Sequence, residues 1–343
     1  MSAIWDFADF DDHEVVHCVR DHASGLTAII AIHSTHLGPA AGGTRFCHYA
    51  DGEAAIRDAL RLSRGMSYKN AMADLPAGGG KAVIVADEAR TKTPDMLAAF
   101  AKAVDGLAGR YITAQDVGMS EADMVAISQH TQNVAGLPGQ GGDPGPYTAR
   151  GVFLGIEAAA KRALGADSLE GVRIAIQGVG SVGGGAARYC AEAGAQLILA
   201  DIDTARAKAL AEELGGDTAS TEEILFQDVD IVSPNALGAI LTEQSIENIT
   251  AKAIAGGANN QLATGNEGRL LQERGILYAP DYVINAGGII NVLRKIDDAD
   301  DEAIYKRIDN IPARLEAVWD ESEKSGMAAN EVADQMAQKL IGR

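Results

Sequence analysis

Three glycines at a fixed spacing, followed by an aspartate, form the clearest binding pattern in this sequence. The stretch "GVGSVG" places Gly178, Gly180 and Gly183 in a G-x-G-x-x-G arrangement, and Asp201 follows about twenty residues on. The apolar run "VRIAIQ" predicts a strand before the glycines, and "SVGGGAARYCAEAG" predicts a helix after them. In that setting the glycines allow a tight turn, close approach of a pyrophosphate and close helix–strand packing. The pattern therefore predicts a dinucleotide site.

Asp201 indicates which dinucleotide fits. A carboxylate at the end of the second strand binds a ribose 2′-hydroxyl and repels a 2′-phosphate, so we expect NAD and not NADP. Arg206 lies nearby in the sequence and weakens that preference. The alternative is a glycine-rich turn in an α/β fold that binds nothing.

A second glycine-rich stretch, "LPAGGGKAVI" at 75–84, ends in a lysine. It does not match a phosphate-binding Walker loop, because Leu75 replaces the leading glycine and Ala82 replaces the hydroxyl residue. We expect its glycines to form a loop and Lys81 to begin the apolar strand "KAVIVA". Apolar surroundings can lower a lysine pKa to roughly 7–8, where the amine acts as a general base. The alternative is a surface lysine at a strand edge.

Three further segments favour the catalytic interpretation of that lysine. "GMSYKN" places Lys69 at the end of a long helix, and "ITAQDVG" places Asp116 just after a strand. "LGPAAGGTR" at 37–45 predicts a third glycine-rich loop. Two lysines and a carboxylate beside such loops are more than structure alone requires.

Length and composition limit the class of protein. The chain has 343 residues, is 47% hydrophobic and 22% charged, and carries a net charge of −19. This is typical of a folded protein of two domains, and the acidity argues against nucleic acid or an anionic membrane as a partner. The three cysteines are far apart and predict neither a disulfide framework nor a metal site. Without a signal peptide or an apolar run long enough to cross a membrane, we expect a cytoplasmic protein.

The order of elements predicts an α/β protein with two domains. The predicted strands of the first part are 14–20, 27–33, 81–86 and 110–116, with helices over 51–66, 93–107 and 121–130. The glycine- and proline-rich segment 136–147 predicts an interdomain loop. Strands and helices then alternate, which favours a doubly wound parallel sheet. We expect domains at 1–135 and 136–311, with a C-terminal helix over about 312–343 returning to the first domain.

Taken together, these motifs resemble the glutamate, leucine, phenylalanine and valine dehydrogenases, most closely the leucine dehydrogenases. The stretches that carry the resemblance are "GPAAGGTRF", "ALRLSRGMSYKNA", "GGGKAVI", "RYITAQDVG", "IQGVGSVG", "AGGANNQL" and "YAPDYVINAGGIINV". They keep the order and spacing of the family from about residue 26 to 292. The resemblance implies an N-terminal substrate domain, a Rossmann-type NAD domain, catalysis between them and a homo-oligomer.

The resemblance also implies roles for individual residues. Lys69 would bind the substrate carboxylate, Lys81 would be the catalytic lysine, and Asp116 would relay protons at the amino group. Asn260 would contact the substrate amine. Further substrate-binding positions are Ala41, Gly42, Gly43, Met66, Ala114, Ile289 and Val292. Further cofactor-binding positions are Thr148, Gly178, Val179, Gly180, Ser181, Val182, Gly183, Asp201, Asn235, Ala236 and Asn285.

The implied reaction is oxidative deamination of an L-amino acid to its 2-oxo acid and ammonia, and the reverse. Hydride leaves the α-carbon for NAD, Lys81 activates water to attack the resulting iminium, and Asp116 helps to expel ammonia. A fixed cation at Lys69 orients the carboxylate.

The side-chain pocket is expected to be apolar. Glutamate dehydrogenases bind the side-chain carboxylate of glutamate with a lysine and a serine, and the matching positions here are Ala41 and Val292. A buried carboxylate without a partner costs several kcal/mol. Ala114 and Val292 look like leucine dehydrogenase, whereas Ala41, Ile289 and Gln115 depart from it in size or charge. These features favour leucine, valine and isoleucine, with phenylalanine as the alternative.

Two other functions are less well supported. An NAD-binding sensor without catalysis need not retain Lys69, Lys81, Asp116 and Asn260 together. A 2-hydroxy acid dehydrogenase needs a histidine–carboxylate pair in its site, but all seven histidines precede the dinucleotide motif and none lies in a matching motif.

Overall fold

The chain folds into two compact units in this computed structural model, which describes residues 3–89 and 91–343. The first unit comprises Met1–Gly142, Val292–Asp300 and Ala337–Arg343, and the second comprises Asp143–Asn291 and Asp301–Met336. The boundary between Gly142 and Asp143 falls inside the glycine- and proline-rich segment that was expected to link the domains.

The first unit contains a five-stranded mixed sheet. Its strands are β1 (Val15–Asp21), β2 (Leu26–Ser34), β3 (Ala40–Cys47), β4 (Gly78–Val85) and β5 (Tyr111–Gln115). They lie in the order β1-β2-β4-β3-β5. β2 runs antiparallel to β1 and β4, whereas β3 runs parallel to β4 and β5. Parallel pairing brings the carboxyl ends of β3, β4 and β5 to the same edge of the sheet.

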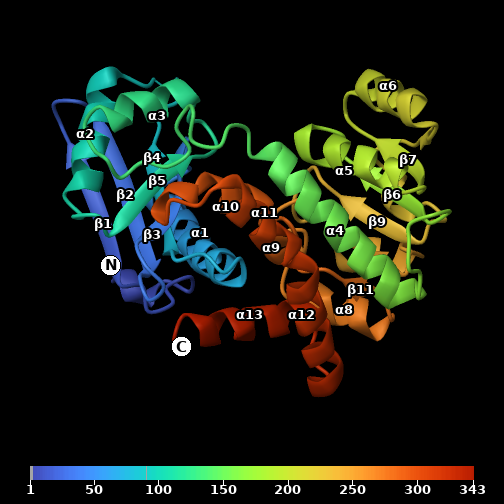
Figure 1. Cartoon of the computed structure of the whole chain (residues 1–343). Coiled ribbons are helices and arrows are strands. Elements are labelled where there is room, and N and C mark those ends of the chain that lie inside the picture. The colour runs from blue at the N-terminus through green and yellow to red at the C-terminus, as the bar shows by residue number, and fades with distance from the viewer. Residues whose placement is uncertain (1–2, 90) are drawn as a thin grey trace. The chain divides into compact units, whose positions relative to one another are not determined.

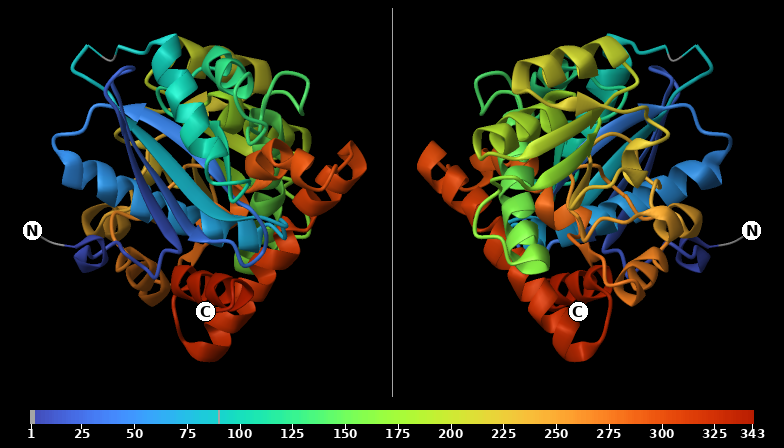
Figure 2. Two further views of the ribbon diagram at one scale, coloured as in Figure 1. Left: turned by 90° about the vertical axis from the view of Figure 1, so that its left-hand side faces the viewer. Right: turned by 90° about the vertical axis from the view of Figure 1, so that its right-hand side faces the viewer.

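Helices cover both faces of this sheet (Figure 1). They are the short η1 (Ile4–Asp6) and the helices α1 (Gly52–Met72), α2 (Pro94–Asp105) and α3 (Glu121–Ser128). Alternate residues of β2 enter different cores: Ala28 and Ile30 pack with α2 and α3, whereas Ile29 and Ala31 pack with α1. The left view of Figure 2 shows α2 in front of the strands. The predicted caps Asp51 and Ser120 accept hydrogen bonds from the amides of the first turns of α1 and α3.

Two segments predicted as loops are strands. Gly78–Gly80 belong to β4, which therefore begins three residues before Lys81, and most of 37–45 belongs to β3. The physical reason is close packing, because a Cβ at Gly79 would lie 2.0 Å from the backbone nitrogen of Ser67 on α1. The glycines let the helix approach the sheet, and they do not serve to make turns.

The second unit contains a six-stranded parallel sheet. Its strands are β6 (Arg173–Gln177), β7 (Gln196–Ala200), β8 (Asp217–Thr218), β9 (Ile231–Pro234), β10 (Ala253–Ile254) and β11 (Leu277–Tyr278). The order β11-β10-β9-β6-β7-β8 reverses direction at β6, and every pair is parallel. This is the doubly wound Rossmann topology, which confirms the predicted α/β fold class. The two-residue β8 was not predicted because both of its residues are polar and exposed, so it shows no apolar run.

The remaining helices follow in chain order. They are α4 (Gly145–Leu164), α5 (Ser181–Glu192), α6 (Thr204–Leu214), η2 (Ile224–Phe226), α7 (Glu243–Asn248), α8 (Glu267–Glu273), α9 (Asp281–Ile284), α10 (Gly287–Val292), η3 (Arg294–Ile296), α11 (Asp301–Asp309), α12 (Ile311–Ser325) and α13 (Ala329–Leu340). One core cluster joins sheet residues to η2, α7 and α8, and α4 and α5 pack together through Phe153 and Tyr189.

The C-terminal return differs from the expected one. We expected residues from about 312 to join the first domain, but only Ala337–Arg343 belong to that unit. α12 packs within the second unit because Trp319 is buried there, and its Nε1 donates to the carbonyl of Tyr278 at 2.8 Å. The last residues contact the first unit through Gln338, whose Nε2 donates to the Tyr68 hydroxyl at 2.9 Å.

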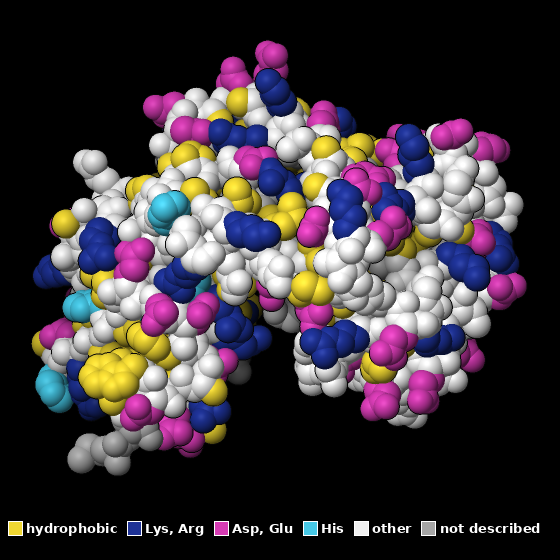
Figure 3. Space-filling view, turned by 90° about the horizontal axis from the view of Figure 1, so that it is seen from below, with side chains coloured by type: hydrophobic (Ala, Val, Ile, Leu, Met, Phe, Trp, Pro, Cys, Tyr) yellow, Lys and Arg dark blue, Asp and Glu magenta, His cyan; other side chains and the backbone are white. Residues whose placement is uncertain are grey.

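Acidic and basic side chains are intermixed over the face of the molecule shown in Figure 3. In the described part of the chain, no helix is both long enough and apolar enough to cross a membrane.

Candidate active site

Lys81 and Asp116 form an ion pair in the first unit. Lys81 lies on β4, two residues before Val83, so its side chain points to the sheet face that packs against α1. Asp116 follows the last residue of β5, and its Oδ2 accepts a hydrogen bond from Lys81 Nζ. Only 6% of the Lys81 surface is exposed. The structure therefore brings the two predicted catalytic residues into direct contact and excludes the alternative of a surface lysine.

Burial and charge shift the pKa values of this pair in opposing ways. Burial lowers the pKa of Lys81, and the charge of Asp116 only partly offsets that effect. Burial would raise the pKa of Asp116, but the Lys81 ammonium and the amide of Val117 hold it below its usual value. A lysine that gives up its proton readily beside a fixed carboxylate is suited to general base chemistry.

Gly43 and Gly42 leave space beside this pair. A Cβ at Gly43 would lie 2.7 Å from the Cβ of Asp116, and a Cβ at Gly42 would lie 1.9 Å from the carbonyl oxygen of Gly80. The hydroxyl of Tyr111 donates to the carbonyl oxygen of Gly42 at 2.8 Å. The missing side chains and the tyrosine therefore fix the backbone of β3 next to the carboxylate.

The last turns of α1 reach the same region. Met66 approaches β3, because a Cβ at Gly42 would lie 3.1 Å from its Cγ. Lys69 lies in the last turn of α1 and is partly buried. Its neighbour Asn70 is fully buried, and its Nδ2 donates to the carbonyl of Gly78 at 2.7 Å, which ties α1 to the start of β4.

Sequence reasoning assigned no role to Asn70 or to Arg45. Both stand inside motifs that carry the family resemblance, which is the signal that could have identified them. Arg45 Nε donates to Asp116 Oδ2 at 3.3 Å, so a second cation contacts the predicted relay carboxylate. Within the described residues, Asn70 Oδ1 has no hydrogen-bond partner.

The predicted side-chain pocket residues are divided between the units. Ala41 is fully buried in β3, and Ala114 on β5 pairs with Gly43. Val292 belongs to the first unit, where a Cβ at Gly136 would lie 3.4 Å from its Cγ1. Ile289 lies on the same helix, α10, but belongs to the second unit.

The glycine motif of the second unit has the predicted turn geometry. Gly178 follows β6 with a φ of 83°, and a Cβ there would lie 2.7 Å from Ala236 Cβ. Gly180 caps α5, and no described atom outside its chain neighbours lies within 4 Å of where its Cβ would stand. At Gly183 a Cβ would lie 1.9 Å from the carbonyl oxygen of Gly178. The amides of Ser181, Val182 and Gly183 begin α5, where backbone N–H groups are available to an anion.

Asp201 lies directly after β7 and contacts the glycine turn. Its Oδ2 accepts a hydrogen bond from the Val179 amide at 2.8 Å, and its Oδ1 accepts one from the Asp203 amide at 2.9 Å. Arg206 Nη1 lies 3.8 Å from Asp201 Oδ2, and its Nη2 lies 3.2 Å from Asp203. The carboxylate is thus fixed at the carboxyl end of the sheet.

Three asparagines lie around the loop that follows β10. Asn235 Oδ1 accepts from the Gly257 amide at 2.8 Å, and Asn285 Nδ2 donates to the Gly257 carbonyl at 3.1 Å. Among the described residues, Asn285 Oδ1 is buried without a partner. Asn260 is exposed and has a φ of 52°. Thr148 on α4 donates to Pro144 O at 3.0 Å, and its Oγ1 would lie 2.6 Å from a Cβ at Gly288.

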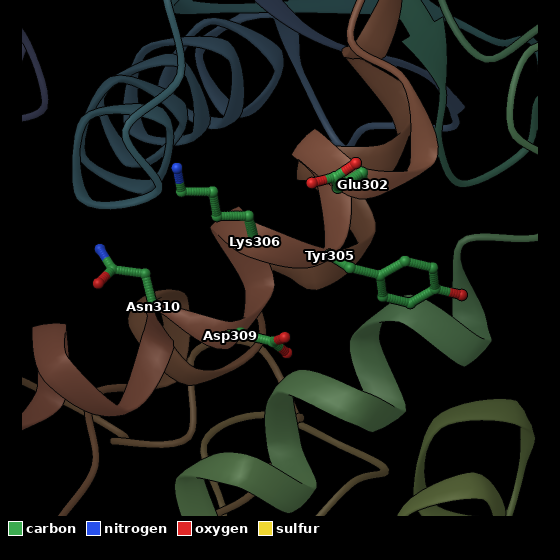
Figure 4. A pocket seen from close by; sticks show the side chains of 5 residues that line it. All are labelled: Glu302, Tyr305, Lys306, Asp309 and Asn310. Carbon is green, nitrogen blue, oxygen red and sulfur yellow. The ribbon is translucent and has the colours of Figure 1, made fainter.

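A surface hollow at α11 contains none of the predicted residues. It measures about 560 Å³ and is lined by Glu302, Tyr305, Lys306, Asp309 and Asn310. Figure 4 shows Lys306 and Asn310 pointing to one side of this helix and Tyr305 pointing to the other. No grouping of three or more possible metal ligands occurs within residues 3–89 and 91–343.

Comparisons with known proteins identify the family of the chain. The family model described as Glu/Leu/Phe/Val dehydrogenase, dimerisation domain, matches residues 13–133, and the Glutamate/Leucine/Phenylalanine/Valine dehydrogenase model matches 142–204 and 199–339. The leucine dehydrogenase of Bacillus subtilis (strain 168) is 47% identical over 337 residues, which cover 97% of this chain and 92% of that protein.

Two further relatives act on aromatic amino acids by name. The phenylalanine dehydrogenase of Bacillus thermotolerans is 39% identical over 98% of this chain and 90% of its own length. The crystal structure of L-tryptophan dehydrogenase from Nostoc punctiforme superimposes with a TM-score of 0.87 and 43% identity, covering 96% of each chain. The chain therefore belongs to the glutamate/leucine/phenylalanine/valine dehydrogenase family and is an amino acid dehydrogenase.

Proposed function

We propose that this enzyme catalyses the NAD-dependent oxidative deamination of an apolar L-amino acid, with leucine, valine and isoleucine favoured, and the reverse reductive amination. The observation that carries the proposal is the buried Lys81–Asp116 pair beside the glycines of β3. A buried lysine with a lowered pKa and a carboxylate partner is the acid–base pair that this reaction needs.

The first unit would hold the amino acid. The Lys69 ammonium would bind its carboxylate, and the backbone of Gly42 and Gly43 would lie beside it. Lys81 would accept a proton from water as the water attacks the α-carbon, and Asp116 would exchange protons with the departing ammonia. Burial lowers the pKa of Lys81, which makes its neutral, proton-accepting form easier to reach.

The second unit would hold the cofactor. Enzymes of this type use a nicotinamide cofactor, which accepts the hydride from the α-carbon. The pyrophosphate would lie against the open side of Gly180 and the first amides of α5. Asp201 would accept a hydrogen bond from the ribose 2′-hydroxyl, which favours NAD over NADP. Thr148 and Asn285, whose buried Oδ1 has no partner in the part of the chain that the structure describes, would line the nicotinamide side. Asn260 would contact the amine of the substrate.

The choice of substrate rests on the apolar character of Ala41, Ala114, Ile289 and Val292. None of these side chains can bind a glutamate carboxylate. A single methylene in such a pocket changes binding by only about 1–3 kcal/mol, so phenylalanine is the second candidate. The phenylalanine and tryptophan dehydrogenases among the relatives support phenylalanine as that second candidate substrate.

We also propose that the enzyme is a homo-oligomer. The support is that the model matching residues 13–133 is described as a dimerisation domain.

The test measures NADH formation by the purified enzyme with leucine, valine, isoleucine, phenylalanine, tryptophan and glutamate. We expect the highest kcat/KM with a branched-chain substrate and no turnover with glutamate. Lys81→Ala should lower kcat at least about 100-fold, as loss of a general base does, while NADH binding measured by fluorescence stays within about twofold. Activity on glutamate alone would contradict the inference that the side-chain pocket is apolar. No activity on any substrate would instead favour an NAD-binding sensor without catalysis.

A further inference from the structure

Arg45 lies between two carboxylates: that of Asp116, which belongs to the catalytic pair, and that of Asp58. It lies on β3 opposite Val83, so its side chain shares a sheet face with Lys81. Its Nε donates to Asp116 Oδ2 at 3.3 Å, and this is the same oxygen that accepts from Lys81 Nζ. Its Nη1 donates to the two oxygens of Asp58 at 3.0 and 3.3 Å. One guanidinium therefore joins two carboxylates.

Asp58 is itself held in place. The Tyr49 hydroxyl donates to its Oδ2 at 2.9 Å, and Arg61 Nη2 donates to its Oδ1 at 3.2 Å. The Asp58 side chain is only 15% exposed. The result is a row of alternating charges that runs from Lys81 through Asp116, Arg45 and Asp58 to Arg61. Because Asp58 is on α1 and Arg45 is on β3, this row also joins the helix to the sheet.

We propose that Arg45, clamped by Asp58, is a positioning residue that keeps Asp116 ionised and directed at Lys81 when Lys81 has lost its proton. The inference rests on the proposed roles of Lys81 and Asp116. It adds a residue whose observed contacts are with Asp116 and Asp58, and we assign it an action through the pair.

The proton balance of the pair requires a second cation beside Asp116. When Lys81 is neutral, Asp116 loses the ammonium that compensates its charge, and a buried carboxylate without a cation takes up a proton. Arg45 prevents this because a guanidinium stays charged at every working pH. The positive charge of Arg45 lowers the pKa of Asp116 and also that of Lys81. It therefore favours the ionised carboxylate of Asp116 and the neutral amine of Lys81.

Other groups around Lys81 do not replace this effect. Asp58 acts on Lys81 in the opposite direction, because its negative charge raises the lysine pKa. The elements that surround β4 also carry His33 on β2, Tyr111 on β5 and Lys69 on α1. His33 bonds to Ser67, and the Tyr111 hydroxyl bonds to Gly42. Arg45 differs from these groups because its hydrogen bonds to Asp116 and Asp58 fix a permanent cation against the Asp116 carboxylate.

The test compares pH profiles of kcat/KM and kcat for the full-length enzyme and its variants. In the wild type we expect activity to rise with pH as Lys81 loses its proton, and this rising part of the profile is its acid limb. Arg45→Gln should move that acid limb to higher pH and lower kcat at pH 7.5 about tenfold, within the range found for contacting charged residues. NADH binding should be unchanged. Arg45→Met is the second neutral variant, for use if Arg45→Gln does not fold.

Two controls separate positioning from general stability. Arg45→Lys keeps a cation and should restore the position of the acid limb, although kcat falls because an amine cannot fork between both carboxylates. Arg61→Gln removes the arginine that contacts Asp58 alone of the two carboxylates. It should leave kcat within about twofold of wild type and the acid limb in place.

A folded Arg45→Gln or Arg45→Met enzyme with the wild-type acid limb would overturn the inference. So would an Arg61→Gln profile displaced as far as that of Arg45→Gln. Failure of the proposed function is recognised separately, by near-normal turnover of Lys81→Ala or by a wild-type enzyme without activity.

Discussion

At the scale of single residues, Asp116 accepts three different donors. Its Oδ2 meets Lys81 and Arg45, and its Oδ1 accepts from the Val117 amide at 2.7 Å. A carboxylate bound in this way is fixed in direction as well as in charge. The absence of a side chain at Gly43 leaves the space that this arrangement occupies. The pair therefore depends on residues that carry no acid–base chemistry of their own.

Asp116→Asn tests the charge at this position while keeping the shape. Asp116 raises the pKa of Lys81, so its loss leaves burial and Arg45, which lower that pKa, opposed only by the weaker effect of Asp58. We therefore expect the acid limb of kcat/KM to move to lower pH, opposite in sign to Arg45→Gln. kcat should fall about 100-fold or more because the proton relay is lost. The pH profile measures both effects, and a limb that moves to higher pH would contradict this account.

At the scale of elements, the contact of α1 with β4 places Met66 and Lys69 beside the catalytic strand. Gly79→Ala would put a Cβ 2.0 Å from the Ser67 backbone nitrogen, and neither backbone can move alone. We expect a loss of about 1–3 kcal/mol in the free energy of unfolding and a raised KM, because the helix that carries Lys69 must shift.

Gly65→Ala is the matched control on the same helix. Gly65 is exposed, and no described atom outside its own helix and neighbours lies within 4 Å of where a Cβ would stand. It should be neutral or stabilising by up to about 1 kcal/mol, because alanine is a better helix former. Urea unfolding and substrate saturation curves measure the two variants. Equal stability of both would show that the close approach is not needed.

The elements also show what the sequence could and could not predict. Apolar runs and caps predicted β2, α1 and the β6–α5 turn, because burial and capping are local in the chain. The glycines of β3 and β4 were assigned to loops, because their partners, such as Ser67 for Gly79, are distant in the sequence. Arg45 was missed for the same reason. Its meaning lies in contacts with Asp58 and Asp116 that only the folded sheet brings together.

At the scale of the whole molecule, one hydrogen-bonded cluster around the buried His33 joins distant parts of the chain within the first unit. Arg343 donates to the carbonyls of Asp11, Asp12 and His33. His33 is fully buried, and its Nδ1 lies 2.8 Å from the Ser67 hydroxyl on α1. The cluster therefore fastens the last residues of the chain to the sheet and to the helix that carries Lys69.

This cluster predicts acid sensitivity of the first unit. Burial, and then the charge of Arg343, lowers the pKa of His33 from 6.5 to about 4, with Asp11 opposing the shift. Because the folded state holds the neutral ring, its stabilising effect is complete above pH 6.5 and is lost as pH falls from 6.5 toward 4. Between pH 7.5 and pH 5 the loss is about 2 kcal/mol, since one pKa unit corresponds to about 1.4 kcal/mol.

Hydrogen exchange measured by mass spectrometry can test this in the folded enzyme. Peptides covering β2 should lose protection between pH 7.5 and pH 5, after correction for intrinsic exchange, whereas peptides covering β6 in the second unit should not. His33→Gln keeps a polar side chain but cannot take up a proton, so its β2 protection should change less over the same range. His13 lies against His33 with a pKa that burial also lowers, and it accounts for the remaining change. Equal losses in wild type and His33→Gln would show that other groups cause the acid sensitivity. Carboxylates with a lowered pKa, such as Asp116, are not among them, because their contribution is lost only below this pH range.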